Sequence, residues 1–240
     1  MNIALRALGN AALDLLVPPS CPGCNAGLFS SSEPSSFCDS CELAIAPRDP
    51  SGCASCDQTN QGRGLCRACR RKLAPLTSIE ATFDYEGPIA AALQSLKYQG
   101  RDDRLRPLAR RWLSEWLPAS QALTRHLVVP VPLHPRRLAA RGFDQSWLLA
   151  REVAKAIGAE ARARALRRTR ATPPQVGLGR AAREVNVRGA FEADGAVAQR
   201  EILLVDDVTT TGSTLRACAE ALMQAGARSV RALVVARAQP

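Results

Sequence analysis

The chain has 240 residues, 46% of them hydrophobic and 22% charged, a composition that excludes bulk disorder. Aromatic residues make up only 4%, which disfavours base stacking as the main mode of nucleic-acid binding. The net charge is +10, and residues 121–200 hold 15 Lys and Arg against 6 Asp and Glu. This basic segment is either a solvated face or, as we expect, a surface that meets phosphate.

The first 19 residues are expected to form a short helix that docks on the body of the protein. Their leucines fall on one helical stripe, but the apolar run is too short to span a membrane. Polar residues interrupt it, and no small-residue cleavage site is evident. We therefore expect no membrane span, no signal peptide and a cytoplasmic protein.

Eight of the nine cysteines form four Cys-x-x-Cys pairs before residue 70, in a segment poor in periodic hydrophobic residues. Such a segment cannot bury enough apolar area to fold unaided, so it needs metal or disulfides. The spacings x2-x13-x2 and x2-x9-x2 are typical of tetrahedral thiolate sites, and without an export signal zinc is favoured over disulfides. We expect a double zinc ribbon over residues 20–72 with about two structural zinc ions, paired in sequence order or as a cross-brace. The expected ligands are Cys21, Cys24, Cys38, Cys41, Cys53, Cys56, Cys66 and Cys69.

Residues 76–240 predict a mainly parallel α/β domain with helices on both faces of the sheet. Strands are expected at 79–85, 126–132, 202–205 and 229–236, helices at 88–99, 104–116, 144–157 and 213–225, and a long loop at 168–190. Asp144 and Gly158 are the expected cap and stop of the helix between them. The C-terminal strand–helix–strand order predicts a right-handed parallel crossover, with Cys218 in its core.

The strongest motif is the apolar run 202–205, followed by two carboxylates and a hydroxyl-rich loop that opens into a helix. Ligands of parallel sheets bind at this edge, and a loop at a helix N-terminus suits a phosphate. Adjacent carboxylates can accept hydrogen bonds from vicinal sugar hydroxyls, so the motif predicts a ribose 5-phosphate pocket. Its expected residues are Asp206, Asp207, Thr209, Thr210, Thr211, Gly212, Ser213 and Thr214.

This segment resembles the phosphoribosyl-pyrophosphate (PRPP) signature of type I phosphoribosyltransferases. Those proteins bind PRPP with magnesium and displace its pyrophosphate with a nitrogen nucleophile. The resemblance implies that Asp206 and Asp207 hold the ribose hydroxyls and that residues 210–214 wrap the 5-phosphate. It also makes magnesium, bound with PRPP, an expected cofactor.

Further stretches extend the resemblance: Val-Pro-Val-Pro-Leu-His at 129–134, Arg-Gly-Phe-Asp-Gln-Ser at 141–146, and scattered Thr, Gln, Arg and Asn positions in 168–190. With the cysteine pairs and the PRPP motif, they resemble the ComF family (ComFC or GntX-like) over nearly the whole chain. Members join an N-terminal zinc ribbon to a phosphoribosyltransferase-type domain. The resemblance implies a role in natural competence, with incoming single-stranded DNA handled after uptake and protein partners in that process.

In that family, residues 130–136 would form the loop that meets pyrophosphate, and residues 168–187 would be a lid over PRPP. The candidate residues are Val131, Pro132, Arg136, Arg137, Arg141, Arg168, Gln175 and Arg183. These arginines could pair with pyrophosphate or with DNA phosphates, and the sequence leaves both open. His134 is expected to be an exposed loop residue, and Lys97 either orients PRPP or lies on the surface.

Three functions remain open at this point. The first is a PRPP-binding protein of DNA uptake, and the alternative is an active transferase that moves phosphoribose from PRPP to a nucleobase or amine. The third is a PRPP-sensing regulator. A transferase needs a region that recognises the base, expected around residues 87–116, and no base-reading or catalytic residue can be named there. This favours the first function.

Overall fold

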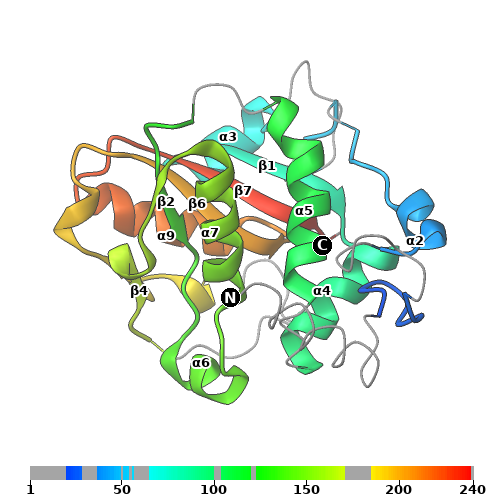
Figure 1. Cartoon of the computed structure of the whole chain (residues 1–240). Helices are drawn as coiled ribbons and strands as arrows, with labels where there is room; N and C mark the ends of the chain where they lie inside the picture. The colour runs from blue at the N-terminus through cyan, green and yellow to red at the C-terminus, as the bar shows by residue number, and fades with distance from the viewer. Residues whose placement is uncertain are drawn as a thin grey trace.

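Five parallel strands form the central sheet of the computed structural model, in the order β1-β7-β6-β2-β3 (Figure 1). Their bounds are β1 Leu76–Asp84, β2 Leu127–Pro130, β3 Glu160–Ala161, β6 Glu201–Thr209 and β7 Ser229–Arg237. The structure describes residues 20–28, 37–49, 51–53, 56, 65–99, 104–119, 123–170 and 185–238. The expected N-terminal helix at 1–19 lies outside these residues.

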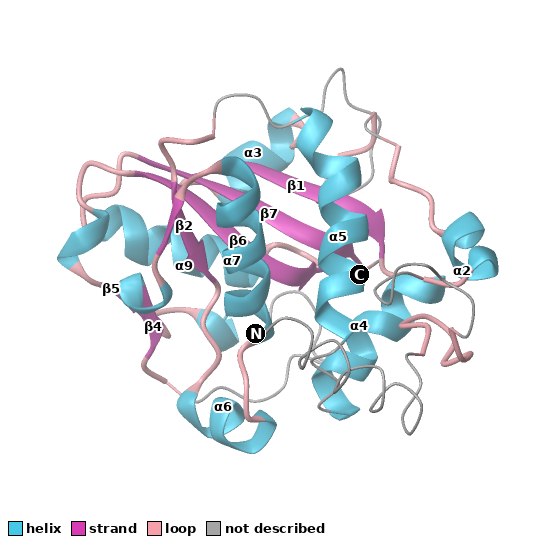
Figure 2. Cartoon of the chain, in the orientation of Figure 1, coloured by secondary structure: helices cyan, strands magenta, loops and turns pink. Residues whose placement is uncertain are grey.

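Helices cover both faces of this sheet, as the apolar strands predict (Figure 2). One face carries α4 (Gly87–Gln99), α5 (Leu105–Trp116) and α7 (Gln145–Ile157), and the other carries α3 (Arg67–Leu73) and α9 (Ser213–Gln224). The short helices α2 (Asp39–Ala44) and α6 (Pro135–Arg141) lie at the periphery. The expected parallel α/β class with helices on both faces is therefore confirmed, and β6, α9 and β7 form the expected parallel crossover.

Local sequence sets the ends of α7 as expected. The Asp144 side chain accepts a hydrogen bond from the Trp147 N–H at 3.1 Å, which caps the helix. Gly158 ends it in the left-handed conformation, with φ at +67°. These two caps fix the register of the helix that faces the carboxyl end of β6.

One expectation about element bounds is wrong. Strand β6 continues to Thr209 instead of ending at Val205, because its pairing with β7 runs on to Arg237. The stretch expected as one long loop at 168–190 starts at the last residue of β4 (Leu166–Arg168) and stops directly before β5 (Phe191–Ala193). Strand β4 pairs antiparallel with β5, so the described ends of this segment are held together.

The two cysteine segments pack into opposite faces of the sheet. Cys21 and Cys41 belong to the hydrophobic cluster built around α4, α5 and α7. Cys53 and Cys69 belong to the cluster built around α9. Among the helices that the structure describes, none combines the length and apolar character that a bilayer crossing requires.

Candidate functional site

The acidic pair lies on the part of β6 that extends beyond its neighbour β2. Pairing between these strands ends at Pro130 and Val205, and the Val131 N–H donates to the Val205 carbonyl at 2.8 Å. Beyond this point β6 is paired only with β7. Asp206 and Asp207 therefore lie on β6 just after the position at which β2 ends. Asp207 is buried and Asp206 is half-buried.

The first turn of α7 orients both carboxylates. The Ser146 hydroxyl donates to Oδ1 of Asp206 at 2.9 Å, and the Gln145 side-chain amide donates to Oδ2 of Asp207 at 3.1 Å. The start of a helix also favours negative charge nearby. Gln145 and Ser146 belong to the Arg-Gly-Phe-Asp-Gln-Ser stretch, but the sequence alone did not predict their contact with the acidic pair. Their position directly after the helix cap Asp144 was the signal that could have pointed to it.

A second layer supports this contact. The Arg141 guanidinium donates to the Gln145 side-chain oxygen, which orients the amide toward Asp207. Burial raises the pKa of the Asp144 carboxyl, and the negative charge of Asp207 raises it further. Residues 141–146 therefore form a support for the acidic pair.

The hydroxyl-rich loop follows at once and leads into α9. We call residues 209–214 the phosphate loop. The hydroxyls of Thr211 and Ser213 are 2.7 Å apart and buried, whereas Thr210 and Thr214 are half-buried. Gly212 precedes α9 with φ at +78°, and no side chain caps the helix. Gly212 has no side chain with which to cap α9, and the start of a helix suits an anion.

Arg168 is a buried cation that senses the charge of the acidic pair. It lies at the end of β4, with its guanidinium 5.4 Å from the centre of the Phe191 ring. Burial lowers the pKa of Arg168, the charge of Arg137 lowers it further, and the charge of Asp206 opposes both. Arg168 therefore interacts electrostatically with Asp206 and with Arg137.

The other candidates take different positions. Val131 and Pro132 are buried, and Arg136 is exposed on α6. His134 is half-buried and caps α6, since its Nδ1 accepts from the Arg136 N–H at 3.2 Å. Cys218 is fully buried in the core, as expected. Gln175, Arg183 and the side chain of Lys97 lie outside the described residues.

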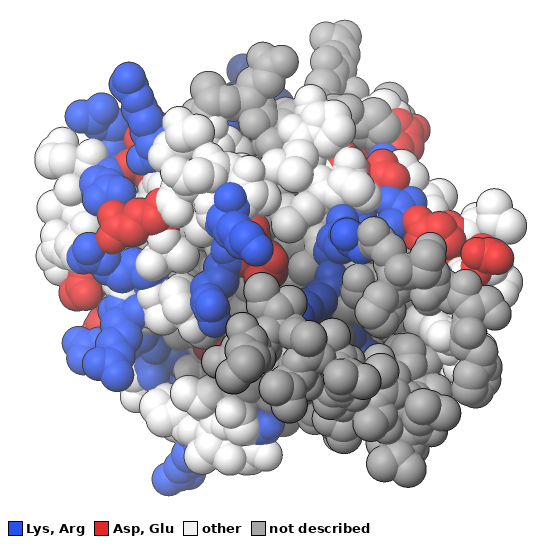
Figure 3. All heavy atoms as spheres, in the orientation of Figure 1, with Lys and Arg blue, Asp and Glu red and all other residues white. Residues whose placement is uncertain are grey.

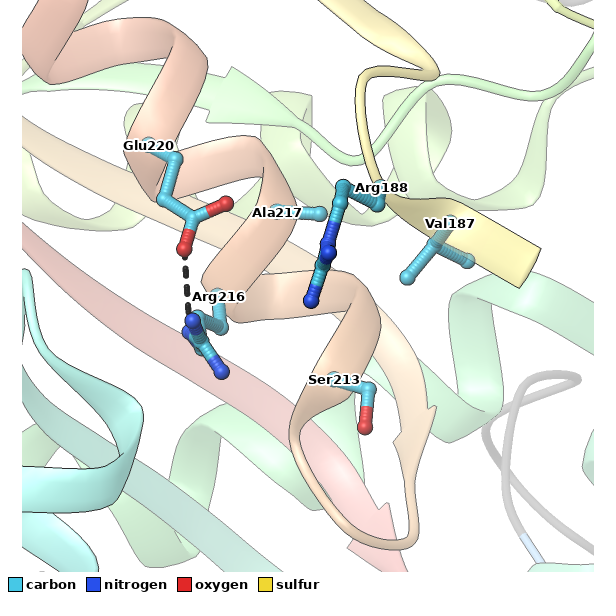
Figure 4. Close-up of a pocket in the computed structure, with 6 residues that line it drawn as sticks. All are labelled: Val187, Arg188, Ser213, Arg216, Ala217 and Glu220. Atoms are coloured by element: carbon cyan, nitrogen blue, oxygen red, sulfur yellow. Dashed lines mark hydrogen bonds and ion pairs between the residues drawn. The ribbon is translucent and has the colours of Figure 1, made fainter. Parts of the chain in front are cut away.

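A small hollow, partly open to solvent, lies between one face of α9 and the segment that leads to β5 (Figure 4). Its lining residues are Val187, Arg188, Ser213, Arg216, Ala217 and Glu220. The four on α9 are three or four positions apart and so share one face. Ser213 lines the hollow and is also part of the phosphate loop, so the hollow adjoins this loop.

Neighbouring groups orient the side chain of Arg216 and the backbone that carries Arg188. The Glu220 carboxylate accepts from Nε of Arg216 at 3.0 Å, which orients the guanidinium (Figure 4). The Arg170 guanidinium donates to the carbonyls of Asn186 and Arg188, at 3.1 and 2.8 Å, and so fixes the backbone that carries Arg188. No acidic side chain among the described residues forms an ion pair with Arg188.

The eight paired cysteines converge into two groups in sequence order, one of the two arrangements that the sequence left open. The first cluster is Cys21, Cys24, Cys38 and Cys41, and the second cluster is Cys53, Cys56, Cys66 and Cys69. In each, the four sulfurs lie within 4.8 Å of one another. The cysteines are free thiols rather than disulfides.

The spacing of the sulfurs fits zinc. With Zn–S bonds of about 2.3 Å, a tetrahedron places neighbouring sulfurs about 3.8 Å apart. The observed distances are 3.6 Å between Cys24 and Cys38 and 3.8 Å between Cys56 and Cys66. The Ser40 hydroxyl, followed by the Cys41 N–H, lowers the pKa of the Cys38 thiol to about 6, whereas burial raises the pKa of the Cys41 thiol, so the fit to zinc rests on the spacing of the sulfurs. Each cluster could therefore hold one zinc ion.

Comparison with known proteins agrees with this geometry. A family model described as a phosphoribosyl transferase domain matches residues 146–239. The match begins at Ser146 and includes the acidic pair, the phosphate loop and α9.

Relatives extend the similarity across most of the chain. It is 32% identical over 205 residues to the DNA utilization protein YhgH of Escherichia coli O157:H7, covering 84% of this chain and 90% of that protein. It is 28% identical over 182 residues to Competence protein F of Haemophilus influenzae, covering 72% and 78%. It is 27% identical over 212 residues to Competence protein ComFC of Streptococcus pneumoniae, covering 88% and 91%. With two four-cysteine clusters ahead of a phosphoribosyltransferase domain, the chain belongs to the ComF family.

Proposed function

We propose that the chain binds PRPP with magnesium at the carboxyl end of β6. The observation that carries the proposal is the placement of Asp206 and Asp207, which α7 orients directly before the phosphate loop and the start of α9. A sugar phosphate requires both a phosphate site and acceptors for its hydroxyls, and this edge offers the two together.

Each part of the site corresponds to one part of the ligand. The phosphate loop and the first N–H groups of α9 receive the 5-phosphate, and the acidic pair accepts hydrogen bonds from the ribose hydroxyls. Arg168, whose charge interacts with that of Asp206 and of Arg137, is the candidate for the pyrophosphate together with Arg137, since guanidinium groups recognise phosphate oxygens well. Magnesium prefers oxygen ligands and supplies the countercharge for the pyrophosphate.

Titration calorimetry with PRPP and magnesium tests this pocket. We expect the wild type to bind PRPP and the double variant Asp206→Asn/Asp207→Asn to lose that binding while its thermal unfolding stays cooperative. Asp39→Asn is the control, because Asp39 is an exposed residue on α2 beside the first cluster. Unchanged PRPP affinity in the folded double variant would rule out the pocket.

An active transferase would use the same pocket, and pyrophosphate release separates it from a binding protein. The protein is incubated with PRPP and magnesium, and with a nucleobase, an amine or single-stranded DNA. Release that depends on one of these acceptors supports the transferase. PRPP binding without release supports a binding protein.

We further infer that the chain acts on DNA in natural competence, as the names of its relatives describe for those proteins, and that it binds single-stranded DNA. The supporting observation is the number of Lys and Arg side chains on the side of the molecule that carries α9, β4 and β5, where some Asp and Glu side chains lie among them (Figure 3). Arg188 and Arg216 both line the hollow beside the phosphate loop, and we expect this pair to contact a phosphate of the strand. Arg168 is buried beside Asp206 and so serves the PRPP pocket instead.

Fluorescence anisotropy with a labelled single strand at several salt concentrations tests this role. Each phosphate contact contributes a slope of about −0.7 in the logarithmic salt dependence of single-strand binding. Arg188→Ala/Arg216→Ala should therefore flatten the slope by about 1.4. The control is Arg162→Ala/Arg228→Ala, which removes the same charge from exposed positions outside the hollow. If the salt slope flattens equally in both variants, Arg188 and Arg216 make no specific phosphate contact.

We infer that both clusters hold structural zinc and that the protein works in the cytoplasm. Free thiols persist in a reducing compartment, and four thiolates at tetrahedral spacing leave no open coordination position for catalysis. We also infer that the chain has protein partners in DNA uptake.

A further inference from the structure

The two clusters contact different parts of the molecule. In the first cluster, a Cβ placed on Gly23 would lie 2.7 Å from Cβ of Pro88, so this segment is packed tightly on the start of α4. Arg104, at the start of α5, donates to the Pro22 carbonyl at 3.3 Å and to the Ser20 hydroxyl at 3.4 Å. The first cluster is thus attached to α4 and α5, on the face of the sheet opposite α9.

The second cluster instead leads directly into the wall of the phosphate loop. Cys66 caps α3, where its sulfur accepts from the Cys69 N–H at 3.5 Å. Leu73, four residues after Cys69 and on the same side of α3, is 3% exposed. A Cβ placed on Gly212 would lie 3.1 and 3.3 Å from the two methyl groups of Leu73, and 3.1 Å from Cδ1 of Ile79. Leu73 therefore packs directly on the backbone of the phosphate loop.

Helix α3 cannot hold this position by itself. It has seven residues, whereas an isolated helix needs roughly 12–15 to be even marginally stable in water. Of the four cysteines of the second cluster, Cys66 caps the helix and Cys69 lies in its first turn, and its last residue is Leu73. The geometry at the cluster therefore sets where Leu73 meets Gly212.

We propose that metal binding at the second cluster positions the phosphate loop through Leu73, whereas the first cluster has no such role. The proposal rests on the proposed PRPP site, and it makes Leu73 a positioning residue rather than a ligand-binding one. Loss of metal from the second cluster frees α3 and opens the packing under Gly212. The loop amides then become mobile, and the 5-phosphate loses its preformed site.

Two matched substitutions test the proposal. Cys56→Ser and Cys24→Ser each remove the second cysteine of the first pair in one cluster, and elemental analysis should show about one zinc lost from each. Hydrogen–deuterium exchange of residues 209–215 should speed up in Cys56→Ser and stay at the wild-type rate in Cys24→Ser. PRPP affinity should fall about tenfold in Cys56→Ser, equivalent to about 1.4 kcal/mol.

A second pair of variants leaves the metal ligands in place. Leu73→Ala should keep both zinc ions yet speed up exchange in the phosphate loop and weaken PRPP binding. Leu93→Ala, which opens a cavity on the opposite face at a fully buried position of α4, should leave the loop unchanged. Because exchange reports on the loop without ligand, a wild type that fails to bind PRPP overturns the proposed function but still tests the coupling. Equal exchange in Cys56→Ser and Cys24→Ser, or a loop unaffected by Leu73→Ala, overturns the proposal.

Discussion

Replacing Gly212 with Ala should destabilise the protein more than the same change at Gly158, which also has a positive φ. The residue has φ at +78°, a conformation that costs an L-amino acid about 1–2 kcal/mol. The new methyl group would also lie 3.1 Å from Leu73 and from Ile79, both buried, and overpacking of this kind costs about 1–3 kcal/mol. Together these costs amount to about 2–5 kcal/mol, within a total stability of about 5–15 kcal/mol.

Urea denaturation measures this cost, and Gly158→Ala separates its two parts. Gly158 also has a positive φ, at +67°, but a Cβ there would meet nothing within 4 Å. Gly158→Ala should therefore lower the free energy of unfolding only by the conformational cost of about 1–2 kcal/mol. Adding Leu73→Ala to Gly212→Ala should recover part of the packing cost, which a double-mutant cycle detects as a favourable coupling. If Gly212→Ala costs no more than Gly158→Ala, the packing of Leu73 on the loop is not as described.

Further expected outcomes concern the metal sites, the support of the acidic pair and the attachment of the first cluster. Freshly prepared, reduced protein should contain about two zinc ions by elemental analysis, and a preparation with none would contradict both clusters as zinc sites. Ser146→Ala should weaken PRPP binding by about 0.5–1.5 kcal/mol through loss of the hydrogen bond to Asp206, and calorimetry that finds equal affinity would remove α7 from the site. Arg104→Met should cost about 1–3 kcal/mol in urea denaturation, because it leaves the buried Pro22 carbonyl without this donor, and an unchanged midpoint would show that the contact carries no stability.

Much of the fold follows from local pattern. Uninterrupted apolar runs identified the buried strands, and the cap residues at 144 and 158 gave the bounds of α7 to within one residue. The phosphate loop was predictable because its residues are contiguous. Grouping of the cysteines in sequence order needed the structure, since both arrangements use the same spacings.

Features that depend on distant contacts were not predictable in this way. The length of β6 is set by pairing with β7, so the strand includes Asp206 and Asp207 instead of ending before them. The short strands β4 and β5 have three residues each, too few to show a period in the sequence, and they are paired with each other. Contacts such as Ser146 to Asp206, 60 residues apart, leave no periodic trace in the sequence.

Competition calorimetry with ribose 5-phosphate and with pyrophosphate tests the pocket most directly. In the proposed pocket the phosphate loop holds the 5-phosphate and the acidic pair accepts from sugar hydroxyls, so we expect ribose 5-phosphate alone to bind and displace PRPP. Asp206→Asn/Asp207→Asn should remove that displacement. If only pyrophosphate competes and ribose 5-phosphate does not bind, the end of β6 is not a phosphoribosyl site.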